Sequence, residues 1–246
     1  MDVRIFSSKQ EMGGAAAAAG AEKIREALAD GGQARIVMAS AASQFEVVEA
    51  LAEENDICWE RVTLFHLDEY VGLSADHPAS FSRFLRERFL AKLPGELQAF
   101  HAINGENEAE AECARVGALL AGEAPVVAFI GIGENGHIAF NDPPADFETE
   151  APYLMVELDE ACREQQVGEG WFPDLEAVPT HALTMSVRQI LKAHRIVCVV
   201  PDDRKAAAVQ KTVEGAINPD APATILHEHD DCLLFLDEPA AGLLTQ

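Results

Sequence analysis

The densest group of chemically capable side chains lies in residues 131 to 143, which read GIGENGHIAFNDP. The three closely spaced glycines favour backbone conformations, or a close approach of a ligand, that a Cβ atom would forbid. Between them and the end of the stretch lies His137, whose imidazole can exchange a proton near neutral pH. Asn135 and Asp142 are placed to orient it. A glycine-rich turn alone is a weak signal, but this density of polar groups indicates an active site.

A buried strand is expected directly before this turn, because residues 126 to 130 form an uninterrupted apolar run, VVAFI. Ligands of open α/β sheets bind outside the carboxyl ends of the strands. A second apolar run, residues 61 to 67, ends in the adjacent carboxylates Asp68 and Glu69. Two carboxylates at a strand end repel each other, and one of them is a candidate general base. His66 is interpreted either as a group that tunes Asp68 or as a structural histidine.

A third candidate is the turn at residues 40 to 44, SAASQ, between an expected strand and an expected helix. A strand, a short turn of small residues and a helix together direct backbone N–H groups toward an anion. The same pattern is explained equally well by Ser43 acting as an ordinary helix cap.

The elements that must hold these residues alternate between apolar runs and amphipathic stretches, which predicts a parallel, doubly wound α/β sheet. The phenylalanines at helical spacing within residues 79 to 93 are expected to pack in the core. Strands are predicted at residues 3–6, 34–39, 61–67, 100–103, 126–130, 153–158, 182–186, 196–200 and 232–236, and helices at 9–30, 45–53, 79–93, 106–121, 159–167, 187–193 and 203–214.

A chain of 246 residues can form one domain, and no internal repeat or linker divides residues 1 to 246. Residues 144 to 180 are acidic and rich in turn-forming residues. A segment of this kind beside an active site often serves as a lid, and we expect that role here.

Composition excludes several partners. The formal net charge of -24 would repel nucleic acid and anionic membranes, so a bound anion needs a local pocket of donors. The five scattered cysteines lack a CxxC pair and are expected to be reduced thiols in a cytoplasmic protein, since neither a signal peptide nor a membrane span is indicated. His227 and His229 have no third ligand at a defined spacing, so no metal is predicted.

Several motifs in order along the chain resemble the glucosamine-6-phosphate deaminase (isomerase) family: LDEYVGL, DHPASF, GIGENGHIAFNDP, IVCVVPDDRKA, VEG and DEPAAGLL. The resemblance covers nearly the whole chain. It implies a Rossmann-like three-layer α/β/α sandwich with a mostly parallel sheet. It also implies conversion of glucosamine 6-phosphate, or a related amino-sugar phosphate, to fructose 6-phosphate and ammonia, with no metal or organic cofactor. The sister 6-phosphogluconolactonases usually continue GHTAS where this chain has GHIAFN, which favours the deaminase branch.

The resemblance also implies roles for single residues. Asp68 matches the base that carries a proton from carbon 2, and His137 matches the histidine that opens the sugar ring. Asn135 and Asp142 match the groups that support the histidine, although many members have aspartate at the first position and most have glutamate at the second. The shorter side chain of Asp142 retracts its carboxylate by roughly one C–C bond, and a shift of about 1 Å can lower a rate ~100-fold.

The resemblance implies phosphate binding by Ser40, Ala41, Ala42 and Ser43 together with Lys205. The family commonly has glycines where this chain has Ala41 and Ala42. If those glycines supply positive φ angles, alanine would resist by roughly 1 kcal/mol or more at each position, and the loop should have changed shape. No arginine aligns with the one in the family's lid, where this chain reads EGWFP, and Arg163 is the nearest substitute.

Two other functions stay open at this point. A lactonase of the sister family would use His137 and have little need of Asp68. A non-catalytic sugar-phosphate-binding module would explain the altered residues in the loop and beside the histidine. The expected ligand in each case is a small sugar phosphate, and assembly into a homo-oligomer is left open.

Overall fold

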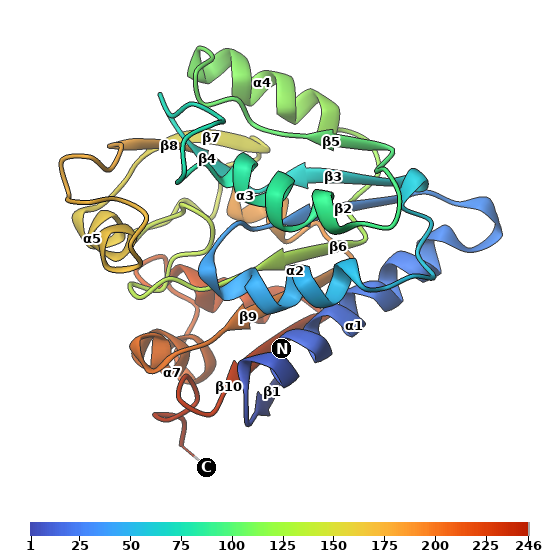
Figure 1. Cartoon of the computed structure of the whole chain (residues 1–246). Coiled ribbons are helices and arrows are strands. Elements are labelled where there is room, and N and C mark those ends of the chain that lie inside the picture. The colour runs from blue at the N-terminus through green and yellow to red at the C-terminus, as the bar shows by residue number, and fades with distance from the viewer. Residues whose placement is uncertain (246) are drawn as a thin grey trace.

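The computed structural model describes residues 1–245 and contains a central sheet of seven strands (Figure 1). All of the paired strands in this sheet run parallel, which confirms the predicted architecture. In spatial order the strands are β1 (Asp2–Phe6), β10 (Cys232–Asp237), β9 (Arg195–Val200), β6 (Val127–Ile130), β2 (Ala34–Met38), β3 (Val62–His66) and β5 (Ala99–His101).

Helices cover both faces of the central sheet, so the fold has the three layers expected. Alternate residues of a strand point to opposite faces, and in β6 Val127 and Phe129 pack in one apolar core while Ala128 and Ile130 pack in the other. The first core is closed by α1 (Lys9–Leu28), α2 (Phe45–Ala52) and α3 (Phe81–Arg88), and the second by α4 (Ala109–Leu120), α6 (Val187–Ile190) and α7 (Ala206–Glu214).

A second, antiparallel sheet departs from the single parallel sheet that the alternating pattern predicted. It consists of β4 (Asp68–Tyr70), β8 (His181–Met185) and β7 (Tyr153–Glu157), in that order. The sequence did not indicate β4, because its extended shape depends on pairing with β8. Only Leu67 separates β3 from β4, and its carbonyl accepts a hydrogen bond from the Met185 N–H at 2.9 Å. Asp68 therefore lies where the chain passes from one sheet into the other.

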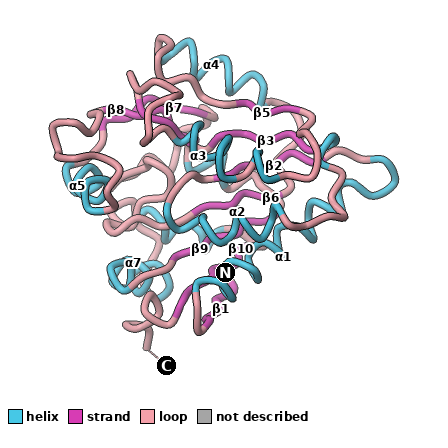
Figure 2. Tube along the Cα trace, in the orientation of Figure 1, coloured by secondary structure: helices cyan, strands magenta, loops and turns pink. Residues whose placement is uncertain are grey.

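The carboxyl ends of β3 and β6 point toward the side of the molecule that carries α5 (Glu160–Gly168) (Figure 1). Loops make up most of the chain on that side (Figure 2). All five cysteines are free thiols, and Cys198 and Cys232 are buried as predicted. Within residues 1–245, no helix has both the length and the apolar character that crossing a membrane requires.

Helix α1 packs closely on the strand that leads to the glycine-rich turn. A Cβ atom added to Gly20 would lie 2.1 Å from Cζ of Phe129, a residue of β6. Nothing lies within 4 Å of a Cβ atom added to Gly14, in the same helix. The close approach of α1 to β6 therefore requires glycine at position 20 only.

Alanine should have opposite effects at these two positions. We expect Gly20→Ala to lower the free energy of unfolding by about 1–3 kcal/mol through overpacking. Gly14→Ala should raise it by about 0.5–1 kcal/mol, because alanine has the higher helix propensity. Urea denaturation of both variants measures the difference, and equal effects of the two substitutions would contradict this account of the α1–β6 contact.

Candidate active site

The glycines after β6 allow the chain to fold closely around His137. The Gly133 N–H donates to the His137 carbonyl at 2.9 Å, and Gly136 has a φ of 90°. A Cβ atom on Gly133 would lie 2.3 Å from Cε1 of the imidazole. Glycine at position 133 therefore lets the ring lie against the backbone, and glycine at position 136 permits the left-handed turn.

Asp142 contacts the imidazole of His137, and Asn135 supports both residues through hydrogen bonds. His137 Nδ1 lies 2.9 Å from Asp142 Oδ1, so the shorter aspartate does reach the ring. Asn135 contacts the ring only indirectly: its Nδ2 donates to Asp142 at 3.1 Å and its Oδ1 accepts from the His137 backbone N–H at 3.0 Å. Burial raises the pKa of Asp142, but the hydrogen bond and charge of His137, together with hydrogen bonds from Asn135 and the Asp159 N–H, leave that pKa lowered. An ionised Asp142 favours a proton on Nδ1 and leaves Nε2 for a ligand.

Asp68 is the buried acid of the pocket. Its side chain lines the same pocket as His137, together with Phe81 and Phe140, whose rings stack 5.7 Å apart. Phe81 thus belongs to the pocket as well as to the core position that its helical spacing predicted. Burial, and secondarily the charge of Glu69, raise the pKa of Asp68 to about 8. The empty pocket therefore holds Asp68 mainly as the neutral acid near pH 7.

Glu69 has a structural role, in contrast to the adjacent Asp68. It accepts hydrogen bonds from the Ser80 hydroxyl at 2.8 Å and from the backbone N–H groups of Tyr70, Phe81 and Ser82 at 3.1, 3.2 and 2.9 Å. These donors lie around the start of α3, so Glu69 ties that helix to β4. Of the two carboxylates, Asp68 alone lines the pocket.

His66 is a buried structural histidine. Its Nδ1 accepts a hydrogen bond from the Ile103 N–H at 3.4 Å, and burial lowers its pKa to about 3. A neutral imidazole of this kind adds no charge beside Asp68. Of the two interpretations of His66, the structure therefore favours the structural one.

Strand β8 positions both chemical groups. Thr184 pairs with Asp68 across the antiparallel sheet, and its hydroxyl accepts a hydrogen bond from the Phe140 N–H at 3.0 Å. The Asn141 side-chain amide donates to the Met185 carbonyl at 2.9 Å. One strand therefore holds the acid and the end of the histidine loop at a fixed separation.

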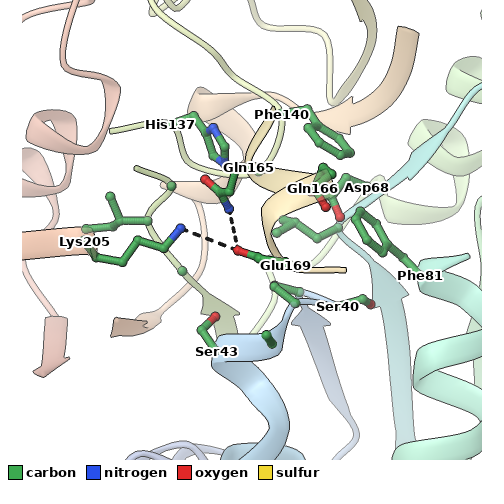
Figure 3. Close-up of a pocket in the computed structure, with 18 of the residues that line it drawn as sticks. Ser40, Ser43, Asp68, Phe81, His137, Phe140, Gln165, Gln166, Glu169 and Lys205 are labelled. Carbon is green, nitrogen blue, oxygen red and sulfur yellow. Dashed lines mark hydrogen bonds and ion pairs between the residues drawn. The ribbon is translucent and has the colours of Figure 1, made fainter. Parts of the chain in front are cut away.

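The residues expected to bind an anion line the same pocket, namely Ser40, Ala41, Ala42, Ser43 and Lys205. In Figure 3 Lys205 and Ser43 lie on the side away from Asp68, whereas Ser40 lies on the side of Asp68. Ala41 has a φ of -129°, and none of residues 40 to 44 has a positive φ. The condition for strain is therefore not met, because the loop follows a path that alanine adopts freely.

The Ser40 hydroxyl oxygen and the Lys205 ammonium nitrogen are buried and lack hydrogen-bond partners. Burial lowers the pKa of Lys205, although nearby carboxylates oppose the shift. Buried polar groups are normally hydrogen-bonded, so both atoms are available to a ligand. The space inside the pocket and its open mouth together is about 760 Å³.

Sequence reasoning missed the acidic residue beside Lys205. Glu169 lines the pocket, and its Oε1 lies 3.7 Å from Lys205 Nζ. Arg163 stays outside, since its guanidinium donates to two backbone carbonyls, whereas Arg204 lines the pocket. The segment EGWFP corresponds to the part of the family's lid that carries an arginine. The charged residue present in this chain, Glu169, has the opposite sign.

One group of side chains within residues 1–245 has the geometry of a metal site: His137, Asp142 and Cys162 have ligand atoms within 4.8 Å of one another. Burial and the neighbouring carboxylates raise the pKa of the Cys162 thiol well above its usual value. Metals bind the thiolate rather than the thiol. This cluster is therefore poorly prepared for a metal, while the rings of His227 and His229 each contact a backbone carbonyl.

A buried carboxyl, an imidazole and a buried lysine that line one sheet-edge pocket define an α/β enzyme that moves protons on a small anionic molecule. The family model for glucosamine-6-phosphate isomerases and 6-phosphogluconolactonases matches residues 7–235. The chain belongs to this family.

Two relatives named glucosamine-6-phosphate deaminase are similar over most of their length. The one from Exiguobacterium sibiricum is 37% identical over 85% of this chain and 81% of its own, and the one from Listeria innocua is 34% identical over 92% and 96%. A solved structure of a monomeric glucosamine-6-phosphate deaminase aligns with a TM-score of 0.90 at 32% identity, covering 99% of this chain and 100% of the other.

Solved 6-phosphogluconolactonases share the fold at lower identity. The Neisseria gonorrhoeae protein, a putative 6-phosphogluconolactonase, aligns with a TM-score of 0.77 at 17% identity, over 97% of this chain and 100% of the other. A likeness at that identity shows the fold alone. The comparisons therefore support the deaminating isomerase and favour neither the lactonase nor the non-catalytic binding module.

Replacing Asp68 by asparagine should change how stability depends on pH. The folded pKa of about 8 exceeds the ordinary value of 3.8, so the folded wild type binds more protons than the unfolded chain between these values. As pH rises from about 4 to about 8, the free energy of unfolding of the wild type should therefore fall relative to that of Asp68→Asn, by at most about 5 kcal/mol. Above about pH 8 the difference between the two proteins should stay constant. Urea denaturation across this range measures the difference, and parallel curves would show that Asp68 is not a buried neutral acid.

Proposed function

We propose that this chain catalyses the deaminating isomerisation of glucosamine 6-phosphate, or of a closely related amino-sugar phosphate, to fructose 6-phosphate and ammonia. The observation that carries the proposal is the buried carboxyl of Asp68 in one pocket with the Asp142-supported imidazole of His137. The names of the relatives support the same reaction.

Ring opening is assigned to His137. The bound sugar is a cyclic hemiacetal, and opening it requires a proton to leave the anomeric hydroxyl and another to reach the ring oxygen. An imidazole with Nε2 free and Nδ1 held by a carboxylate can accept and return a proton on one side of the sugar. The support from Asp142 stabilises the imidazolium that forms transiently.

The isomerisation is assigned to Asp68. The carboxylate takes the proton from carbon 2 of the open-chain aldehyde and delivers it to carbon 1, while one proton of the substrate ammonium passes to the oxygen on carbon 1. The product is the imine of fructose 6-phosphate, with a hydroxyl group on carbon 1. One water then adds to this imine and ammonia leaves. The substrate ammonium at carbon 2 favours the ionised carboxylate, so binding itself converts the neutral acid of the empty pocket into the base.

The phosphate is assigned to Ser40, Ser43 and Lys205, with the backbone N–H groups at the start of α2. Each chemical step is a proton transfer or an addition of water, so side chains of this one chain can supply all of the groups. The proposed unit is residues 1 to 246 as one domain, and its free thiols fit a cytoplasmic setting.

Residues 144 to 180 are proposed to act as a lid over this pocket. Gln165, Gln166, Glu169 and Trp171 come from α5 and the turn after it, and all four line the pocket. Movement of this segment would exclude water from the imine until isomerisation is complete.

The direct test is ammonia release from glucosamine 6-phosphate by the purified protein. We expect turnover by the wild type, a loss of ~1,000-fold or more in Asp68→Asn because the amide cannot accept a proton, and a loss of ~100-fold or more in His137→Ala. Opening of 6-phosphogluconolactone is measured in parallel. Lactone hydrolysis that survives Asp68→Asn, without ammonia release by the wild type, would replace this proposal with the lactonase.

The pH dependence of kcat/KM provides a second test, because that ratio reports ionisations of the free enzyme. Below about pH 8 most of the free enzyme carries neutral Asp68, so kcat/KM should rise nearly tenfold per pH unit toward a midpoint near 8. The substrate concentration used to calculate kcat/KM is that of the form with a protonated amine. Ionisation of the substrate amine then does not contribute to the pH profile. A profile that is level from about pH 6 to 9 would exclude Asp68 as a base with a raised pKa.

A further inference from the structure

The anion-binding end of the pocket already contains a carboxylate directed at its lysine. Lys205 Nζ lies 3.7 Å from Glu169 Oε1 and 3.9 Å from Glu134 Oε1, and it has no hydrogen-bond partner. The side chains of Lys205 and Glu169 are each 8% exposed. Figure 3 shows the two facing each other across the pocket.

Glu169 is held in this position. The Gln165 side-chain amide donates to its Oε1 at 2.8 Å, and the Trp171 indole N–H donates to its Oε2 at 3.3 Å. Its own backbone N–H donates to the Gln165 carbonyl at 2.8 Å, at the end of α5. Glu134 differs, because its side chain is 36% exposed and can turn to solvent. Glu169 is therefore the fixed negative charge of this site.

The charges at this end balance before any ligand binds. Two cations, Lys205 and Arg204, face two carboxylates, Glu169 and Glu134, with Arg204 3.4 Å from Glu134. A doubly charged anion at Lys205 would approach Glu169 in a buried pocket, where repulsion is stronger than in water. The other charged or titratable groups lining the pocket are Asp68, His137 and Asp202, the last paired with Lys9 at 2.5 Å.

One proton shared between the ligand and Glu169 would convert this repulsion into a hydrogen bond. The dianion of a phosphate monoester takes up a proton near pH 6, whereas an ordinary glutamate side chain takes one up only near pH 4.3. The shared proton is therefore more easily placed on the phosphate. The resulting P–OH donates to the carboxylate, while another phosphate oxygen accepts from Lys205. A sulfate dianion takes up no proton near neutral pH and cannot make this bond.

We propose that Glu169 is a specificity-determining residue that selects the singly protonated form of a phosphate group, so that binding of a phosphate dianion takes up one proton from solvent. The proposal rests on the proposed function only in placing a phosphate at Lys205. It assigns Glu169 the role of acceptor for the P–OH group, and it makes the pocket discriminate between phosphate and sulfate.

The test is titration calorimetry of the full chain with inorganic phosphate and with sulfate at about pH 8, in two buffers with different heats of ionisation. We expect the wild type to bind phosphate at least ~tenfold more tightly than sulfate, with uptake of close to one proton. Glu169→Gln should bind sulfate ~tenfold or more tightly than the wild type does, and should lose both the preference and the proton uptake. Glu176→Gln removes the same charge from an exposed position in the same segment and should match the wild type.

Equal affinity of the wild type for both anions, proton uptake that persists in Glu169→Gln, or binding of neither anion would each overturn the inference. Ammonia release separates this outcome from the fate of the proposed function. A protein that releases ammonia but fails the calorimetric test keeps the reaction without selection by Glu169. If the protein passes the calorimetric test but releases no ammonia, selection by Glu169 is supported and the proposed substrate is rejected.

Discussion

The pocket depends on the hydrogen bonds through which the chain leaves the seven-stranded sheet at Leu67. The Leu67 carbonyl and β4 are both paired by β8, so the extended chain continues from one sheet into the other and carries Asp68 into the junction. The same strand accepts the Phe140 N–H on the Thr184 hydroxyl and the Asn141 side-chain amide on the Met185 carbonyl. One strand therefore positions the acid through backbone pairing and the histidine loop through two hydrogen bonds that each use a buried side chain.

That junction also determines the electrostatics of the site. Asp68 is buried between the two sheets and beside aromatic rings, and burial keeps its carboxyl neutral until a cation arrives. At the other end, Lys205 is equally buried but has two carboxylates for neighbours. The two ends therefore differ, because burial favours the neutral form of Asp68 while neighbouring carboxylates offset the charge of Lys205. These two environments occur in one pocket because Asp68 lies in β4 while Lys205 precedes α7.

The sequence predicted the parts of the structure that depend on local pattern. The apolar run at residues 126–130 became β6, and the glycines beyond it fold around His137 as their spacing indicated. Strand β4 was not predictable, because DEY has no strand pattern and its pairing partner lies more than 100 residues further along. The role of Glu69 depends on donors at the start of α3, and the unstrained path of Ala41 depends on a backbone angle. Neither can be read from residue types alone.

The departures from the family pattern lie outside the sheets. Ser40 to Ser43 form a turn after β2, Asn135 and Asp142 lie in the loop after β6, and Glu169 follows α5. A change of residue there alters charge and hydrogen bonding without moving β3, β4 or β8. Asp68 has no such freedom, because it lies in β4 and pairs with Thr184 of β8. A carboxylate at position 169 therefore adds charge beside Lys205 without disturbing the strand pairing that holds Asp68.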